Sequence, residues 1–149
     1  MQLKWKFNCF KELNVDELYT ILQLRNEVFV VEQNCVYQDA DSKDSISFHL
    51  SCWDEGKLVA YCRILPPGIS YKEASIGRVV SSPHYRNKGY GKELMNEAIK
   101  HTVKEFNCNT IKISAQLYLQ KFYEKLGFVQ VSDSYLEDNI PHIEMLYAR

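Results

Sequence analysis

Apolar and polar positions along the first third of the chain predict a strand followed by a helix. Apolar side chains alternate with polar ones through Leu3, Trp5 and Phe7, which is the two-residue period of a strand. Asn14 and Glu17 then stand where an N-cap and its acidic partner begin a helix, and apolar positions at helical spacing continue it to about Val31. The polar, acidic stretch 38–45 interrupts this pattern, and we expect it to be exposed.

The middle of the chain predicts a hairpin and then a strand, a loop and a long helix. Apolar runs at 46–53 and 58–65 flank the turn sequence Asp54-Glu55-Gly56-Lys57, which is typical of a β-hairpin. A β-branched run from Ser75 predicts a fourth strand, and a basic, glycine-bearing loop follows it and leads into the helix.

The last forty residues alternate again between strand and helix patterns. The expected elements are a strand at 110–115, a second long helix at 117–126 closed by Gly127, a strand at 128–131, a turn-rich connection at 135–141 and a final strand at 142–147. The predicted order is therefore β-α-β-β-β-α-β-α-β-β. This order predicts one α/β domain spanning residues 1–149, a mixed sheet with helices on both faces. The unit from Ser75 to Ala115 is expected to form a right-handed parallel crossover.

Composition narrows the classes of function. A net charge of −1 argues against a nucleic-acid binder that relies on bulk charge. No apolar run approaches the roughly 20 residues that span a bilayer, and the N-terminal sequence is too short and polar for a signal peptide. The five cysteines are scattered and include no CxxC pair, a pattern that is typical of proteins whose cysteines stay reduced. We therefore expect a cytoplasmic protein. The four histidines lack the spacing of a metal site, and none is predicted.

The loop between the fourth strand and the long helix is suited to holding a phosphate group. Its sequence is Arg86-Asn87-Lys88-Gly89-Tyr90-Gly91, and the first turn of a helix carries unpaired N–H groups and partial positive charge. A Walker A loop is excluded because Glu93 stands where that motif needs Ser or Thr. A dinucleotide fingerprint is excluded because Leu94 replaces its third glycine.

The remaining pattern, R-x-x-G-x-G after a strand, resembles the cofactor motif of the GNAT family of N-acetyltransferases, through Arg86, Gly89 and Gly91. The segment Gln116–Phe128 resembles the second cofactor motif of that family, although many members carry Asn in place of Gln116. The stretches 24–35, 76–79 and 135–142 resemble the ElaA-like branch, whose substrate is poorly defined. The resemblance implies a GNAT-like, mostly antiparallel sheet.

The resemblance also implies acetyl-CoA as co-substrate and an amine as acceptor, joined in a ternary complex for direct transfer. Tyr123 stands at the place of the general acid of the family. Main-chain groups near the end of the fourth strand would face the pantetheine arm and polarise the acetyl carbonyl. The cofactor-binding residues implied are Val79, Val80, Ser81, Arg86, Asn87, Lys88, Gly89, Tyr90, Gly91, Lys92 and Gln116.

The general base and the acceptor stay open at the level of sequence. The candidates for the base are Glu32, His49, His142 and Glu144, with proton transfer through water or without a base as an equal alternative. Glu32 and His142 are also candidates for the acceptor site. Arg25 is expected to form a structural ion pair, with Glu32 or with an acceptor carboxylate as its partner. Homodimers are common in the family. The alternative function is a non-catalytic acyl-CoA sensor or interaction module on the same fold.

Overall fold

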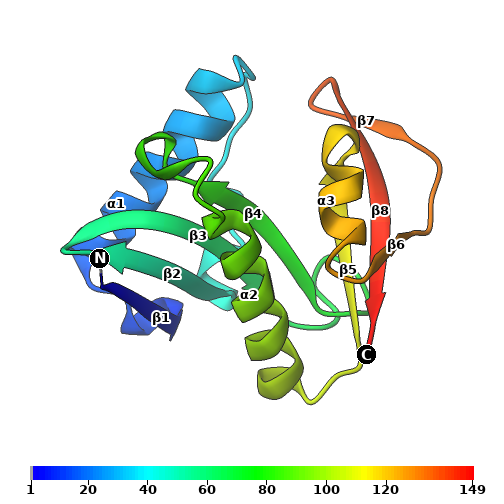
Figure 1. Cartoon of the computed structure of the whole chain (residues 1–149), viewed down its shortest axis with the longest axis horizontal. Coiled ribbons are helices and arrows are strands. Elements are labelled where there is room, and N and C mark those ends of the chain that lie inside the picture. Colours follow the sequence, from blue (N-terminus) through cyan, green and yellow to red (C-terminus); the bar gives the residue numbers. More distant parts are fainter. Residues whose placement is uncertain (1) are drawn as a thin grey trace.

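The computed structural model describes residues 2–149, which form two four-stranded sheets with helices packed on them (Figure 1). The first sheet has the order β1-β2-β3-β4 and is antiparallel throughout; its strands are β1 (Leu3–Cys9), β2 (Phe48–Asp54), β3 (Lys57–Leu65) and β4 (Ser75–Ser81). The second sheet has β8 paired antiparallel with each of the others; its strands are β5 (Thr110–Gln116), β6 (Phe128–Gln130), β7 (Tyr135–Glu137) and β8 (Ile140–Ala148).

The two sheets touch where β4 and β5 begin and then separate. Ala74 and Ile111 form a parallel bridge, in which the N–H of Lys112 donates to the carbonyl of Ala74 at 2.9 Å. No further ladder joins β4 to β5 within residues 2–149, and Figure 1 shows the two sheets diverging from this region. The parallel relationship predicted for this unit is confirmed, and the predicted mixed, mostly antiparallel sheet is present as two sheets that splay apart where β4 and β5 separate.

Helices cover both faces of the first sheet, as predicted (Figure 1). The helix α2 (Tyr90–Phe106) buries Leu94, Met95 and Ala98 against one face. The helix α1 (Val15–Arg25) packs Ile21 and its apolar neighbours into a second cluster with residues of β2 and β3. The central strand β3 is buried along nearly its whole length between these two layers.

The first helix begins where the sequence predicts and changes its winding before it ends. The Asn14 side chain accepts from the N–H of Glu17 at 2.7 Å, and the Glu17 carboxylate accepts from the N–H of Asn14 at 3.0 Å, which is a capping box. After Arg25 the chain continues as a π-helical segment, η2 (Asn26–Glu32). The predicted helical stretch to Val31 is therefore present, but it carries a wider turn of the kind that is frequent at functional sites.

Two predictions for the C-terminal third are wrong. The first concerns the long helix expected at 117–126. The chain there forms a 3₁₀ turn, η5 (Leu117–Leu119), and then a short helix, α3 (Gln120–Glu124). The tight turn before α3 and the turn after it, in which Gly127 has a φ of +102°, limit the length of this helix.

The second concerns the connection expected at 135–141, which contains the strand β7. This strand pairs with β8 through a two-residue turn. Asp138 and Asn139 both have positive φ in this turn, the geometry that two-residue hairpins need. The element order therefore has one strand more than predicted. The smaller elements are η1 (Phe10–Glu12), η3 (Asp44–Ile46) and η4 (Pro83–Tyr85).

The acidic stretch 38–45 is only in part the exposed loop that its composition predicts, because its three aspartates are half-buried while Gln38, Ala40, Ser42 and Ser45 are exposed. Arg25 is fully buried, and its guanidinium donates to Asp39 Oδ2 at 2.8 Å and to Asp44 Oδ1 at 2.8 Å. The predicted structural ion pair of Arg25 is therefore present, but Glu32, one of the two partners considered for it, pairs with Arg86 instead. Burial alone would raise the pKa of Asp44, but hydrogen bonds and charge from Arg25 and Arg63 outweigh it and hold that pKa below its usual range. The stretch is therefore folded back by its carboxylates onto arginines of α1 and β3.

Candidate active site

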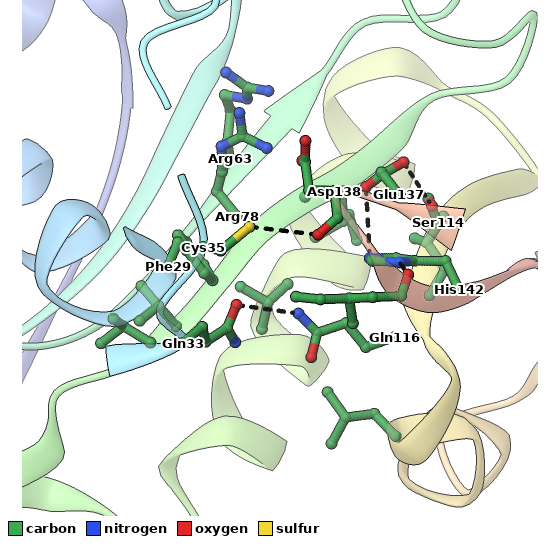
Figure 2. A pocket seen from close by; sticks show the side chains of 18 of the residues that line it. Phe29, Gln33, Cys35, Arg63, Arg78, Ser114, Gln116, Glu137, Asp138 and His142 are labelled. Carbon is green, nitrogen blue, oxygen red and sulfur yellow. Dashed lines mark hydrogen bonds and ion pairs between the residues drawn. The ribbon is translucent and has the colours of Figure 1, made fainter. Parts of the chain in front are cut away.

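A cleft of about 860 Å³ lies between the diverging strands β4 and β5 (Figure 2). Its walls come from η2 and the following loop, from β4, from β5 and from the β7–β8 hairpin. Side chains from both sheets point into it, so the cleft exists because the two sheets part.

The β4 wall contains a β-bulge opposite Cys62. Arg63 pairs with Gly77 and Tyr61 pairs with Val80, so Arg78 and Val79 together face one residue of β3. Arg78 has a φ of +51°, which is rare for a residue with a side chain. A bulge leaves main-chain groups outside the ladder, and these are the groups that the sequence predicts for contact with a cofactor. The predicted residues Val79, Val80 and Ser81 all line the cleft.

Two arginines, Arg63 and Arg78, line the upper part of the cleft in Figure 2. Arg63 donates to both oxygens of Asp41, at 2.7 and 2.9 Å. Arg78 Nε lies 2.8 Å from Asp39 Oδ1, and its Nη2 donates to the Asp39 carbonyl at 3.0 Å. Both guanidinium groups are therefore matched by carboxylates of the acidic stretch.

The basic loop lies between β4 and α2, at one end of the cleft. Gly89 has a φ of +81° and occupies the N-cap position of α2, a conformation that favours glycine. Of the predicted loop residues, Arg86 and Asn87 line the cleft. The remaining five do not line it and sit at the start of the helix beside it: Lys88, Gly89, Tyr90, Gly91 and Lys92. The first-turn N–H groups of α2 thus lie next to the cleft, where an anion could reach them.

The Arg86 side chain is bound by Glu32, a residue that the sequence proposes as a base. Nη2 of Arg86 donates to Glu32 Oε1 at 2.6 Å and Nη1 donates to Oε2 at 3.0 Å. Both side chains are partly exposed, at 39% and 42%. The ion pair connects the end of η2 with the predicted phosphate loop.

Tyr123, the predicted general acid, lines the cleft from α3 and is otherwise buried. Its ring packs edge-on against Phe122 and Phe128, with centroids 5.1 and 5.9 Å apart. Burial raises the pKa of its hydroxyl well above the ordinary value, so the phenol stays protonated at neutral pH. Among the described residues, no hydrogen bond joins this hydroxyl to another group, which leaves the phenol proton available to a bound molecule.

The predicted residue Gln116 ends β5 and contacts the opposite wall of the cleft. Its Nε2 donates to Oε1 of Gln33 at 3.4 Å, and Figure 2 shows this hydrogen bond crossing the space between the walls. Nearby, the Cys35 thiol contacts the carbonyl of Asp138 at 3.6 Å. The loop after η2 therefore touches the second sheet at two points.

His142, predicted as a base or acceptor residue, lies on β8 and lines the same cleft as Tyr123. Its Nδ1 is 2.6 Å from the carbonyl oxygen of Ile140. A carbonyl only accepts, so Nδ1 carries a proton. Nε2 lies 3.5 Å from Oε2 of Glu137.

Two other base candidates lie outside the cleft lining. His49 is buried, where its Nε2 donates to the Asp44 carbonyl at 2.9 Å and its Nδ1 accepts from the Tyr61 hydroxyl at 2.7 Å. Burial lowers the pKa of His49, consistent with a neutral structural histidine. Glu144 forms an ion pair with Lys112 at 3.3 Å. The structure therefore gives both side chains structural partners.

Sequence reasoning did not single out Ser114 as a cleft residue. The buried positions of β5 are Ile111, Ile113 and Ala115, so the strand turns Ser114 and Gln116 to the other side. The alternation of buried and half-buried residues could have identified Ser114. That this face of β5 lines a cleft became clear only from the separation of β4 and β5 in the structure. Within residues 2–149 we found no group of three or more His, Cys, Asp or Glu side chains arranged to hold a metal, and no helix long and apolar enough to cross a membrane.

Comparison with known proteins identifies the family. Residues 15–148 match the family described as acetyltransferase (GNAT) domain. The chain belongs to this family. A UPF0039 protein of Schizosaccharomyces pombe is 44% identical over 145 residues, covering 96% of this chain and 95% of the relative.

Solved structures support the same assignment. A crystal structure of an acyl-CoA N-acyltransferase from Pseudomonas aeruginosa superposes with a TM-score of 0.94 at 44% identity, covering 99% of this chain and 100% of that one. Escherichia coli ElaA superposes with a TM-score of 0.92 at 38% identity, covering 98% and 99% of the two chains. The predicted GNAT fold and the predicted ElaA-like branch are thereby confirmed.

Proposed function

We propose that this GNAT protein is an acetyl-CoA-dependent N-acetyltransferase that transfers the acetyl group directly to an amine in a ternary complex. The observation that carries the proposal is the position of Tyr123, which lines the cleft between β4 and β5 and whose hydroxyl has no hydrogen bond among the described residues. The similar protein from Pseudomonas aeruginosa is described as an acyl-CoA N-acyltransferase, which supports an acyl thioester as donor.

The cofactor would lie along the cleft with its pyrophosphate at the start of α2. Backbone N–H groups at Gly89 to Gly91 would bind the phosphate oxygens, with Arg86 adding charge. Main-chain groups freed by the bulge at Val79 would contact the pantetheine arm and polarise the thioester carbonyl. Acyl-CoA supplies an activated carbonyl carbon, and the protein supplies orientation and proton transfer.

The reaction forms a C–N bond and breaks a C–S bond. The neutral amine attacks the thioester carbon, and collapse of the tetrahedral intermediate expels the CoA thiolate, which takes the phenol proton of Tyr123. The nitrogen, starting as an ammonium group, loses two protons in forming the amide. One leaves through the base to solvent, and the other restores Tyr123, so that it ends in effect on the CoA sulfur.

We propose His142 as the base in preference to Glu32. The His142 side chain lines the cleft beside Gln116, and its Nε2 lies 3.5 Å from Oε2 of Glu137, which can accept the proton that the base takes up. The carboxylate of Glu32 is bound by Arg86 instead. We also propose a cytoplasmic setting, because all five cysteines are free thiols.

A thiol-release assay tests the proposal. Purified protein with acetyl-CoA should release CoA thiol only when an amine acceptor is present, and acetyl-CoA should raise the melting temperature by binding the native state. Binding without release in the presence of any acceptor would favour the alternative of a non-catalytic acyl-CoA sensor. No binding at all would contradict both functions.

A further inference from the structure

One donor of a buried arginine in the cleft has no acceptor. Arg63 belongs to β3, is only 4% exposed and lines the cleft. Its Nη1 donates to Oδ1 of Asp41 at 2.7 Å and to Oδ1 of Asp44 at 3.1 Å, and its Nη2 donates to Oδ2 of Asp41 at 2.9 Å. Its Nε is buried and has no hydrogen bond to any group within residues 2–149. The aspartates therefore hold the end of the guanidinium and leave the side that carries Nε unpaired.

The unpaired side of Arg63 has the geometry of a carboxylate site. Nε and Nη2 each direct an N–H bond from this side, and two parallel N–H bonds of one guanidinium match the two oxygens of a carboxylate. A buried donor without an acceptor is costly unless water or a ligand completes it. In Figure 2, Arg63 and Arg78 lie on the side of the cleft that β3 and β4 form. An anion in the cleft would complete the hydrogen bonding of Arg63.

The neighbour of Arg63 on β4 is a glycine that leaves space in the cleft. Gly77 lines the cleft and pairs directly with Arg63, so a side chain at position 77 would stand on the same face of the sheet as Arg63. A Cβ on Gly77 would have no atom within 4 Å beyond those of its chain neighbours, and the φ of Gly77 is not positive. Neither packing nor backbone conformation therefore requires glycine here. A ligand in this space would account for the missing side chain.

The charges around Arg63 favour an anion. Three arginines and three aspartates pair with one another on this side of the cleft and cancel in charge: Arg25, Arg63, Arg78, Asp39, Asp41 and Asp44. The Lys43 N–H shares Oδ1 of Asp41 with Arg63, and its Nζ donates to the Ser70 hydroxyl at 3.2 Å without an ion pair among the described residues. The lining carboxylate that forms no ion pair within residues 2–149, Asp138, lies on the opposite wall at the β7–β8 turn. The surplus charge beside Arg63 is therefore positive.

We propose that Arg63, with the open space over Gly77, binds a carboxylate of the acceptor, and that the acceptor is a short amine that carries this carboxylate, such as a small amino acid. Gly77 lies two residues before Val79, at most about 7 Å along the strand, so a few carbon atoms would connect the carboxylate to an amine at the thioester. The nitrogen gains the acetyl group and CoA leaves as the thiol, while the carboxylate stays unchanged. This inference rests on the proposed acetyltransferase function, since it names the acceptor of that reaction.

Three acids and their amides test the charge of the acceptor. Glycine, β-alanine and 4-aminobutanoate place the carboxylate at increasing distance from the amine. Glycinamide, β-alaninamide and 4-aminobutanamide have nearly the same shapes without the negative charge. With acetyl-CoA saturating, kcat/KM for the best acid should exceed that for its own amide by about tenfold, as one charge-assisted contact implies.

Two substitutions test the residues. Gly77→Asp supplies a carboxylate beside Arg63 from the protein itself, so the ratio of acid to amide should fall to about one or below. Arg63→Lys keeps a positive charge for Asp41 but removes the two parallel N–H bonds, and it should lower the ratio at least about threefold. Val129→Asp is the matched control: Val129 is 64% exposed on β6, lies outside the cleft lining and should keep the wild-type ratio. Acetyl-CoA affinity within about twofold of wild type serves as the check that each variant is folded.

The outcomes separate this inference from the function beneath it. Turnover of the amides by the wild-type protein as fast as the acids overturns the inference and leaves the acetyltransferase intact. So does turnover of none of these amines while acetyl-CoA still binds, and so does a preference for the acid that survives both Gly77→Asp and Arg63→Lys. Failure of the wild-type protein to bind acetyl-CoA overturns the proposed function itself.

Discussion

Arg86 donates from both of its terminal nitrogens to the carboxylate of Glu32, at 2.6 and 3.0 Å. The ion pair joins the π-helical segment that follows α1 to the loop that precedes α2, and both of its side chains line the cleft. A pyrophosphate group bound at α2 would compete with Glu32 for the same guanidinium. If the protein binds acetyl-CoA as proposed, the affinity should depend on how easily Arg86 exchanges one anion for the other.

Glu32→Gln should tighten acetyl-CoA binding by about two- to fivefold, because a partly exposed ion pair is worth at most about 1 kcal/mol and the variant frees Arg86. Titration calorimetry at low and high salt measures the effect, which should shrink as salt rises. Arg86→Ala is the opposing variant and should weaken binding by about tenfold or more. Weaker binding by Glu32→Gln would show that Glu32 supports the cofactor rather than competing with it.

Tyr123→Phe should lower kcat by about 100-fold, the usual contribution of general acid catalysis, while the Kd for acetyl-CoA stays within about twofold. The aromatic packing against Phe122 and Phe128 does not need the hydroxyl, so stability should change little. Because burial raises the pKa of Tyr123, its ionisation should not reduce activity anywhere below about pH 10. Tyr19→Phe, on the exposed surface of α1, is the control. An unchanged kcat in Tyr123→Phe would remove this tyrosine as the acid.

Arg25→Met should destabilise the protein by about 3–5 kcal/mol, because it leaves the carboxylates of Asp39 and Asp44 without their buried partner. Urea denaturation followed by tryptophan fluorescence gives the free energy of unfolding. Lys100→Met is the matched control: its ion pair with Glu97 lies on the surface and should be worth less than about 1 kcal/mol. Equal losses in the two variants would contradict the structural role of the buried pair.

The free energy of unfolding should decrease in two steps as the pH is lowered. Burial lowers the pKa values of His49 and of half-buried His101, so the unfolded chain takes up protons first and stability is lost as the pH falls through about 6.5. Asp44 has a lowered pKa for the reasons given above, so its contribution is fully present above about pH 4 and lost below it.

Urea midpoints measured between pH 8 and pH 3 test this profile. His49→Gln should flatten the first step, apart from the part that comes from His101, and should leave the second step in place. A wild-type midpoint that stays constant from pH 8 to pH 5 would contradict the assignment of neutral, buried histidines.

Local signals in the sequence predicted the features that depend on neighbouring residues. The Asn14 cap, the positive φ of Gly127 and the hairpin at Gly56 each depend on a few adjacent side chains, and each was found where expected. The family resemblance supplied what local signals could not, namely the fold and the grouping of Tyr123 with Val79 in one cleft.

Features that depend on distant partners could not be predicted in this way. Nothing within the stretch 38–45 indicates that its aspartates will meet Arg25 and Arg63, which stand 14 to 22 positions away. Charge composition alone favours solvent, and only the fold brings the arginines close enough to reverse that preference.

The separation of β4 from β5 has a consequence for any molecule that enters between them. Each of these strands is the outermost strand of its own sheet, so each presents a row of peptide N–H and C=O groups that no neighbouring strand satisfies. A ligand with amide bonds of its own can supply the missing rungs and join the two sheets through itself, as an added strand would. Without a ligand, the protein has a sheet that is divided between β4 and β5, and a ligand of this kind would fill the gap between the two halves.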